Sequence, residues 1–174
     1  MLAVREGDID RLSLLFERHH LRLYNFFLRM TGRPDDGEDL VQEVFLRMIH
    51  YRGTYRDDSR FETWMFQIAR NARIDSFRKT RRDGSSGELR DPADPDPGPE
   101  ESLVKRNETA MLRRAMALLP DEKREVLLLS RFENMEFREI ARILQEKETT
   151  VKVRAHRAVR ELGEIYRQIT EERS

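Results

Sequence analysis

The sequence from Leu119 to Leu162 decides the fold of the C-terminal part of this chain: LPDEKREVLLLSRFENMEFREIARILQEKETTVKVRAHRAVREL. Its apolar spacing predicts three short amphipathic helices. The last of them is basic through Lys152, Arg154, Arg157 and Arg160. Short helices joined by tight turns, with a basic final helix, are typical of a helix-turn-helix that places one helix in a DNA groove. DNA is therefore the leading candidate partner.

The last predicted helix has an apolar face and a polar face. Its apolar residues recur at helical spacing: Val151, Ala155, Ala158, Leu162 and Ile165. The residues off this stripe are available to DNA: Lys152, Val153, His156, Arg157 and Arg160. The alternative is that the basic residues form only a solvated face. Because the helix follows REIARIL and a short turn, we favour DNA binding.

The charges of the chain are separated into blocks. The 33 Lys and Arg residues balance the 33 Asp and Glu residues, and a formal net charge of zero by itself argues against a nucleic-acid binder. Basic residues nevertheless cluster in two segments. These are Arg60, Arg70, Arg73, Arg78, Lys79, Arg81 and Arg82 in one, and Lys147, Lys152, Arg154, Arg157 and Arg160 in the other. Such blocks present basic faces locally.

The composition argues against several other classes of protein. The absence of cysteine excludes a disulfide framework, a thiolate metal site and a thiol nucleophile. The histidines are not spaced as ligand pairs and form no recognisable metal or acid–base motif with acidic residues, so we expect them at the surface or beside helix caps. They are His19, His20, His50 and His156. No apolar run approaches the roughly 18 residues of a membrane span, and we expect no signal peptide before the first polar helix. We therefore expect a cytoplasmic protein that is not an enzyme, without catalytic residues, metal or cofactor.

Residues 83–101 separate two parts of the chain. This stretch is rich in Gly, Pro, Ser and acidic residues, so it cannot bury enough apolar surface to fold alone. We interpret residues 83–102 as a flexible linker between a domain of residues 1–82 and a domain of residues 103–174. The alternative is a long loop inside one domain, but structureless loops of this length are uncommon there.

The N-terminal part is predicted to contain three helices. Asp8 is positioned to cap the first, which Gly32 ends. The second runs from about Asp35 to Tyr51. Ser59 and Glu62 resemble a capping box that opens the third. Since no segment shows convincing strand alternation, the predicted fold class is all-α, with a three-helix domain, a linker and a domain of about four helices.

The segment of residues 39–82 indicates which kind of DNA binder this is. Asp39, Gln42 and Glu43 form an acidic and amide surface on one side of the second helix. The third helix and the loop before it interleave aromatic residues with cations, which suits single-stranded nucleic acid because unstacked bases need a π-face and phosphates need charge.

Most of these aromatic residues have a simpler explanation. We assign Phe61, Trp64 and Phe77 to the core. Tyr55 lies in the loop after Gly53, outside a helical stripe, and is the better stacking candidate.

The chain resembles an extracytoplasmic-function sigma factor, the minimal bacterial type with only region 2 and region 4. Region 2 motifs are matched by DLVQEVFLRM and FETWMFQIARNARIDSFRK. Region 4 motifs are matched by LPDEKREVLLLSRF, EIARIL and TVKVRAHRAVREL. The resemblance covers nearly the whole chain apart from the linker. Two motif blocks in the right order and spacing are far more specific than a helix-turn-helix alone.

The resemblance implies a sigma factor that binds core RNA polymerase and directs promoter-specific transcription initiation. Region 2 would dock the clamp helices of the polymerase β′ subunit through Asp39, Gln42 and Glu43. It would also melt the minus-10 element and hold its non-template strand. The implied minus-10 residues are Tyr55, Arg56, Gln67, Arg70, Asn71 and Arg78.

Region 4 would read the minus-35 element in the major groove and pack against the flap of the polymerase β subunit. The implied minus-35 residues are Lys152, Val153, His156 and Arg157. A cognate anti-sigma factor is a further implied partner. Neither a small-molecule substrate nor membrane insertion is expected.

The turn of residues 145–149 departs from the family pattern, in which a small residue or glycine precedes an apolar residue and a serine. Gln145 is a poorer left-handed residue than glycine. Glu146 lacks the usual apolar character, and Glu148 adds negative charge, which suits the helix dipole but opposes nearby phosphate. Val153 stands where a small polar residue is common. We predict an altered minus-35 preference or a weaker dependence on that element.

Two alternatives remain open at this point. An ordinary helix-turn-helix regulator explains residues 119–162 but leaves the match over residues 39–82 as coincidence. A sigma-like protein that binds regulators and no longer initiates transcription is the second, slightly favoured by the unusual turn.

Overall fold

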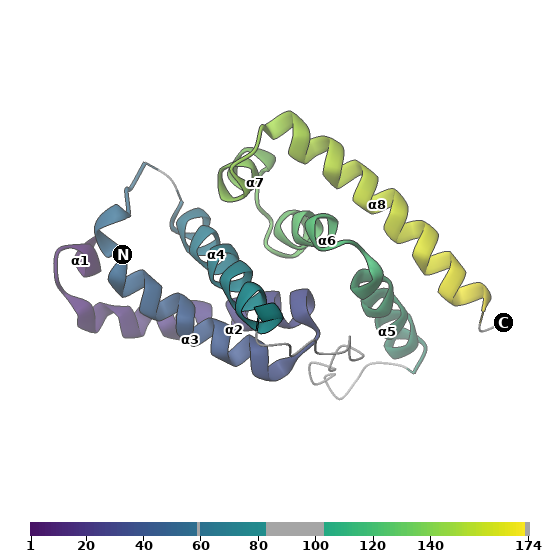
Figure 1. Cartoon of the computed structure of the whole chain (residues 1–174), viewed down its shortest axis with the longest axis horizontal. Helices are drawn as coiled ribbons and strands as arrows, with labels where there is room; N and C mark the ends of the chain where they lie inside the picture. The colour runs from purple at the N-terminus through teal and green to yellow at the C-terminus, as the bar shows by residue number, and fades with distance from the viewer. Residues whose placement is uncertain (59, 83–102, 173–174) are drawn as a thin grey trace.

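The computed structural model describes residues 1–58, 60–82 and 103–172, and all regular structure within these ranges is helical (Figure 1). The N-terminal half, residues 1–82, contains α1 (Leu2–Arg5), η1 (Ile9–Arg11), α2 (Leu12–Thr31), α3 (Pro34–His50), η2 (Arg52–Thr54) and α4 (Phe61–Arg82). The C-terminal half, residues 103–172, contains α5 (Leu103–Leu118), α6 (Asp121–Leu127), η3 (Leu128–Phe132), α7 (Phe137–Leu144) and α8 (Glu148–Glu171). The all-α prediction is confirmed for these ranges.

Two predictions fall on other residues. The flexible linker of residues 83–102 lies outside the described residues, so the domain boundaries stay a prediction. Ser59, half of the predicted capping box at the start of α4, lies outside them as well.

The first long helix begins later than predicted. Asp8 precedes the single turn η1 and makes no side-chain hydrogen bond to the backbone; its carboxylate instead accepts a hydrogen bond of 3.2 Å from Arg11 Nε. Helix α2 then starts at Leu12. The prediction that Asp8 caps this helix was therefore wrong.

Local signals fix the junction between α2 and α3. Gly32 ends α2 with a left-handed φ of 71°, a conformation that glycine adopts without steric cost. Pro34 occupies the first turn of α3, where its missing N–H is no loss. Gly37 of α3 lies against α2, because a Cβ there would stand 3.1 Å from Cε2 of Tyr24. The predicted break at Gly32 is confirmed, and it lets the two helices pack closely.

The N-terminal core lies between α2, α3 and α4. Its largest fully buried members include Leu23, Phe26, Phe27, Met48, Met65 and Phe66. Phe61 and Trp64 are partly buried and pack against this core, in line with their assignment. Phe77 is 58% exposed, so its assignment to the core was wrong. The reason is that α4 extends past the core, and its last buried residue is Ala72.

The C-terminal core is built from α6, α7 and α8 together with the end of α5. Its fully buried members include Leu119, Leu128, Leu129, Ile140, Ile143 and Val151. A capping box opens α7: the Glu136 side chain accepts from the N–H of Glu139, and the Glu139 carboxylate accepts from the N–H of Glu136 over 2.9 Å.

The two halves pack against each other (Figure 1). Helix α7 contacts α4, and α2 contacts α5 and α6. Helix α8 lies on the side of the C-terminal half that faces away from the N-terminal half (Figure 1). The fold therefore separates the two predicted DNA-binding surfaces, because α4 lies at the junction of the halves and α8 lies away from it.

Candidate nucleic-acid interface

Helix α8 presents a basic face to solvent. Val151, Ala155 and Ala158 are buried, and Leu162 and Ile165 pack partly buried against the same core, so the predicted apolar stripe is confirmed. The four predicted minus-35 residues are exposed: Lys152, Val153, His156 and Arg157. A helix with one face buried and cations on the other has the arrangement that major-groove binding requires.

The unusual turn before α8 is held together by paired charges. Gln145 adopts φ 58° and ψ 42°, the left-handed conformation in which glycine is common. The carboxylate oxygens of Glu146 accept hydrogen bonds of 2.9 and 2.8 Å from Nη2 of Arg154. This ion pair stabilises the turn at a position where the family usually has an apolar side chain. It also engages Arg154, one of the cations of α8. Lys152 also pairs with Glu148, at 2.6 Å.

A groove of about 610 Å³ lies beside α4, next to the end of α3 and η2. It collects Gln67, Arg70, Asn71 and Arg78, which are four of the predicted minus-10 residues. Tyr51 lines the same groove and is 46% exposed. Aromatic, amide and guanidinium groups within one groove provide what a single DNA strand needs, which is a π-face for bases and charge for phosphates.

The aromatic wall of this groove is fixed by a hydrogen bond. Nε1 of Trp64 donates to Oγ1 of Thr54 over 3.2 Å, and both residues line the groove. Sequence spacing places Tyr51 on the apolar stripe of α3, three residues after the buried Met48. Because α3 ends at His50, Tyr51 no longer belongs to that stripe. The spacing of apolar residues does not show where the helix ends, so Tyr51 was not predicted to lie in the groove.

Tyr55 does not line the groove. Its side chain is 7% exposed, with its ring edge-on to Trp64 at 5.4 Å and to Phe61 at 6.1 Å. Burial raises the pKa of the Tyr55 hydroxyl, and Arg5 Nη1 donates to the Tyr55 carbonyl over 3.2 Å. The expectation that Tyr55 offers an accessible ring face was wrong for this conformation, although its role at the promoter stays a prediction. The neighbouring Arg56 is exposed.

The predicted polymerase-binding residues lie on the outer face of α3. Asp39 and Gln42 are exposed, and Glu43 accepts a hydrogen bond of 2.6 Å from Arg47 Nε. Leu46 is exposed one turn further along the same face, where an apolar residue adds contact area to a polar surface. Leu46 is not among the residues predicted from the sequence, although its spacing of three from Glu43 places it on that face.

The histidines differ in their surroundings. Within residues 1–58, 60–82 and 103–172, no group of three His, Asp or Glu side chains is placed to hold a metal ion. His19 lies half-buried beside Phe61, and burial lowers the pKa of its imidazole. His20 stacks on Phe16 with a centroid distance of 4.8 Å. His19 is therefore only partly exposed, although a surface position was expected.

Two family descriptions match the chain: Sigma-70 region 2 over residues 15–83, and Sigma-70, region 4 over residues 109–162. RNA polymerase sigma factor CarQ of Myxococcus xanthus is 32% identical over 95% of this chain and 94% of its own length. The chain belongs to the extracytoplasmic-function RNA polymerase sigma factors. SigL of Mycobacterium tuberculosis, named as such a factor, is 32% identical over 87% of this sigma factor and 86% of its own length. The resemblance found in the sequence is confirmed, and promoter-directed initiation is favoured over an independent helix-turn-helix regulator.

This sigma factor also shares its fold with solved structures. RpoE of Bartonella quintana, solved with the anti-sigma factor NepR, matches with a TM-score of 0.74 and 22% identity, over 89% of this chain and 96% of that chain. CnrH, solved with the cytosolic domain of CnrY, matches with a TM-score of 0.71 and 22% identity, over 94% and 92%. Among the helices of the described ranges, none combines the length and apolar character of a membrane-spanning segment.

Proposed function

We propose that this sigma factor holds the non-template strand of the minus-10 element in the groove beside α4. The observation that carries the proposal is the gathering of Gln67, Arg70, Asn71 and Arg78 beside an exposed tyrosine ring. In this assignment Tyr51 stacks on an unpaired base, and Asn71 hydrogen-bonds to a base edge. The cations hold phosphates. Stacking and base contacts together offset the few kcal/mol that base extrusion costs.

Tyr55 and Arg56 have a different part in this proposal. Tyr55, the stacking residue expected from the sequence, supports the loop that precedes α4 through its contacts with Phe61 and Trp64. Arg56 is exposed on that loop and contacts the strand as it leaves the groove.

Helix α8 reads the minus-35 duplex through Lys152, Val153, His156 and Arg157. The support is their joint exposure on one face of a helix whose opposite face is buried. Because Arg154 is paired with Glu146 and Val153 offers only apolar contact, we propose a weaker dependence on the minus-35 element than a fully cationic helix would give.

The outer face of α3 docks core polymerase. Asp39, Gln42 and Glu43 supply polar contacts to the β′ clamp helices, and the exposed Leu46 extends that contact. The C-terminal half packs against the β flap. An anti-sigma factor is a further proposed partner, because the similar RpoE of Bartonella quintana was solved with one.

The test is run-off transcription with core polymerase on a library of promoters, with and without this sigma factor. We expect promoter-specific transcripts that depend on it; their absence would refute the proposal. Asp39→Ala with Gln42→Ala should weaken polymerase binding, whereas Glu17→Ala, which removes an exposed carboxylate of α2, should not. Tyr51→Ala should leave polymerase binding intact and reduce strand opening, followed by 2-aminopurine fluorescence within the minus-10 element.

A further inference from the structure

Three glutamates of the C-terminal half are buried where it meets the N-terminal half. Glu125, Glu133 and Glu139 are only 3%, 5% and 6% exposed. A buried carboxylate is costly unless cations or hydrogen-bond donors surround it. For all three, the N-terminal half supplies such groups.

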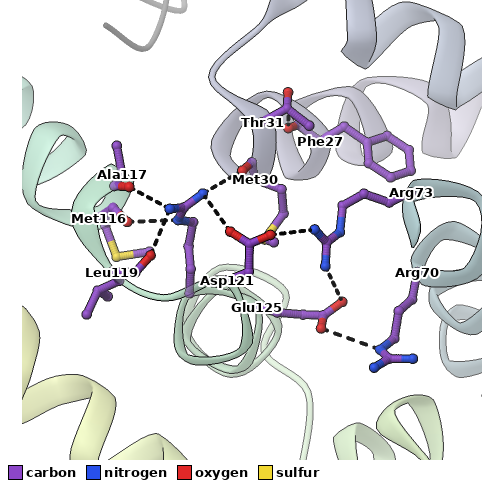
Figure 2. Close-up of polar contacts among 11 residues, drawn as sticks. Phe27, Met30, Thr31, Arg70, Arg73, Met116, Ala117, Leu119, Asp121 and Glu125 are labelled. Carbon is purple, nitrogen blue, oxygen red and sulfur yellow. Dashed lines mark hydrogen bonds and ion pairs between the residues drawn. The ribbon is translucent and has the colours of Figure 1, made fainter. Parts of the chain in front are cut away.

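The contact around Glu125 involves the cations of α4. Glu125 Oε2 lies 3.4 Å from Arg70 Nε, and Glu125 Oε1 lies 3.6 Å from Arg73 Nη2. Arg73 Nη1 also donates to Asp121 Oδ2 over 3.1 Å. Figure 2 shows the Asp121 side chain of α6 directed at Arg73 and the Glu125 side chain directed at both Arg70 and Arg73. Two carboxylates of α6 thus contact two neighbouring cations of the proposed strand-binding helix.

This contact is close but incompletely bonded. Oε1 of Glu125 and the Nε atoms of Arg70 and Arg73 are buried, and within the described residues they have no hydrogen-bond partner. The contacts of Glu125 with Arg70 and Arg73 are therefore held mainly by charge, without the short hydrogen bonds of a strong arginine–carboxylate pair. A ligand with better-placed anionic oxygens, such as a phosphodiester, can replace the carboxylates.

Two further contacts hold the same interface away from α4's groove. Arg22 Nε donates to Glu133 Oε2 over 2.5 Å, and Arg22 Nη2 donates to the Glu133 carbonyl over 3.0 Å. Arg124 of α6 is buried, and its Nη1 donates to the Met30 carbonyl at the end of α2 over 2.6 Å. Beside the apolar core that the two halves share, the closed arrangement thus includes polar contacts that water and ions can replace when the halves part.

We propose that α6 is an internal competitor of promoter DNA, in which Asp121 and Glu125 occupy on Arg70 and Arg73 the place that strand phosphates take in the open protein. The proposal rests on the proposed function of the α4 groove. In the closed chain Arg70 of the groove is engaged by Glu125, as is Arg73 three residues further along α4, whereas Asn71 and Arg78 of the groove are exposed. Separation of the halves, which simultaneous contact with two promoter elements requires, completes that face.

The experiment measures closure and strand binding separately on the full chain. Because the chain contains no cysteine, Leu21→Cys on α2 and Glu164→Cys on α8, both exposed, can carry a fluorescence energy-transfer pair. Strand binding is followed by anisotropy of a short fluorescein-labelled single-stranded DNA of mixed sequence. Asp121→Asn with Glu125→Gln should lower energy transfer and tighten strand binding by about tenfold, the factor expected when the binding-competent fraction rises from about one tenth to nearly all.

Two further variants separate opening from a simple change of charge. Glu122→Gln removes a carboxylate from the same helix, but Glu122 is exposed and its partner is Arg154 of α8, so neither signal should change. Arg22→Gln breaks the interface away from the groove and removes a cation, which by itself weakens DNA binding. It should nevertheless lower energy transfer and tighten strand binding.

Unchanged energy transfer in folded Asp121→Asn with Glu125→Gln and in Arg22→Gln would overturn the proposal. So would a fall in energy transfer without tighter strand binding, because the carboxylates would then hold the halves together without competing with DNA. Energy transfer requires neither polymerase nor promoter, so this outcome is distinguishable from a failure of the proposed function, which run-off transcription detects.

Discussion

The two basic surfaces of this sigma factor carry similar residues but engage their charges differently. On α8, His156 and Arg157 are exposed on an outer surface of the molecule. On α4, Arg70 and Arg73 face carboxylates of the other half of the chain. A cluster of cations in a sequence therefore indicates the capacity to bind nucleic acid, and the tertiary contacts decide how much of it is available at once.

Removal of Arg124, the buried cation between the two halves, should lower the stability of the protein more than any other change considered below. Nε, Nη1 and Nη2 of Arg124 donate to carbonyls of Met116, Met30, Ala117 and Leu119, and burial lowers the pKa of its guanidinium. Arg124→Met leaves these carbonyls without their donors, so we expect the free energy of unfolding to fall by about 3 kcal/mol. Urea denaturation followed by circular dichroism measures this loss. Arg131→Met, at an exposed position, should cost less than about 0.5 kcal/mol, and an equal cost for both would contradict the assignment.

The second prediction concerns the exposed basic face of α8. Arg157→Ala removes an exposed cation from α8 and should weaken binding to a minus-35 duplex by about 1–3 kcal/mol if it contacts a base. Fluorescence anisotropy with a labelled promoter duplex measures the change. Arg167→Ala, an exposed arginine near the end of the same helix, serves as the control. Equal losses for both variants would show that α8 attracts DNA without a preferred face.

Glu146→Gln tests whether the ion pair in the turn keeps Arg154 of α8 from DNA, because it removes the carboxylate that engages Arg154. We expect stability to fall by about 1 kcal/mol, since the turn loses a charged hydrogen-bonded pair. Arg154 then keeps only its 3.8 Å contact with the exposed Glu122 among the described residues and becomes available to phosphate, so the salt dependence of duplex binding should steepen by about one released counterion. Anisotropy titrations at several salt concentrations give this slope. An unchanged slope would mean that Arg154 does not reach the duplex.

The smallest effect concerns the backbone of the turn. Gln145 has a φ of 58°, so Gln145→Gly should raise the free energy of unfolding by about 0.5–1 kcal/mol through relief of left-handed strain. Gly163→Ala in α8 should raise the free energy of unfolding by a similar amount, because alanine favours the helical conformation more than glycine does. A Cβ at this position meets no atom within 4 Å. Thermal unfolding of both variants checks the pair. A destabilised Gln145→Gly would show that the Gln145 side chain itself supports the turn.

Much of the local structure could be predicted from the sequence. The helix break at Gly32 and the buried stripe beginning at Val151 follow from short-range periodicity and backbone preference, and both are confirmed. The errors at Phe77 and Tyr55 share one cause. Periodicity tells which side of a helix is apolar, but burial depends on whether another element covers that side, and α4 runs past its core whereas the loop at Tyr55 folds under Trp64.

The candidate site likewise has features that the sequence predicts and features that depend on tertiary contacts. The sequence by itself determined the all-α class, the two sigma-factor motif blocks and the exposed cations of α8, because helical spacing and residue chemistry are local properties of the chain. Only the tertiary structure decided that Tyr51 lines the α4 groove and that Glu125 faces Arg70 and Arg73. Those contacts join residues up to 55 positions apart, between Arg70 and Glu125, and charge pairing at that separation is set by how the halves pack, for which local sequence carries no signal.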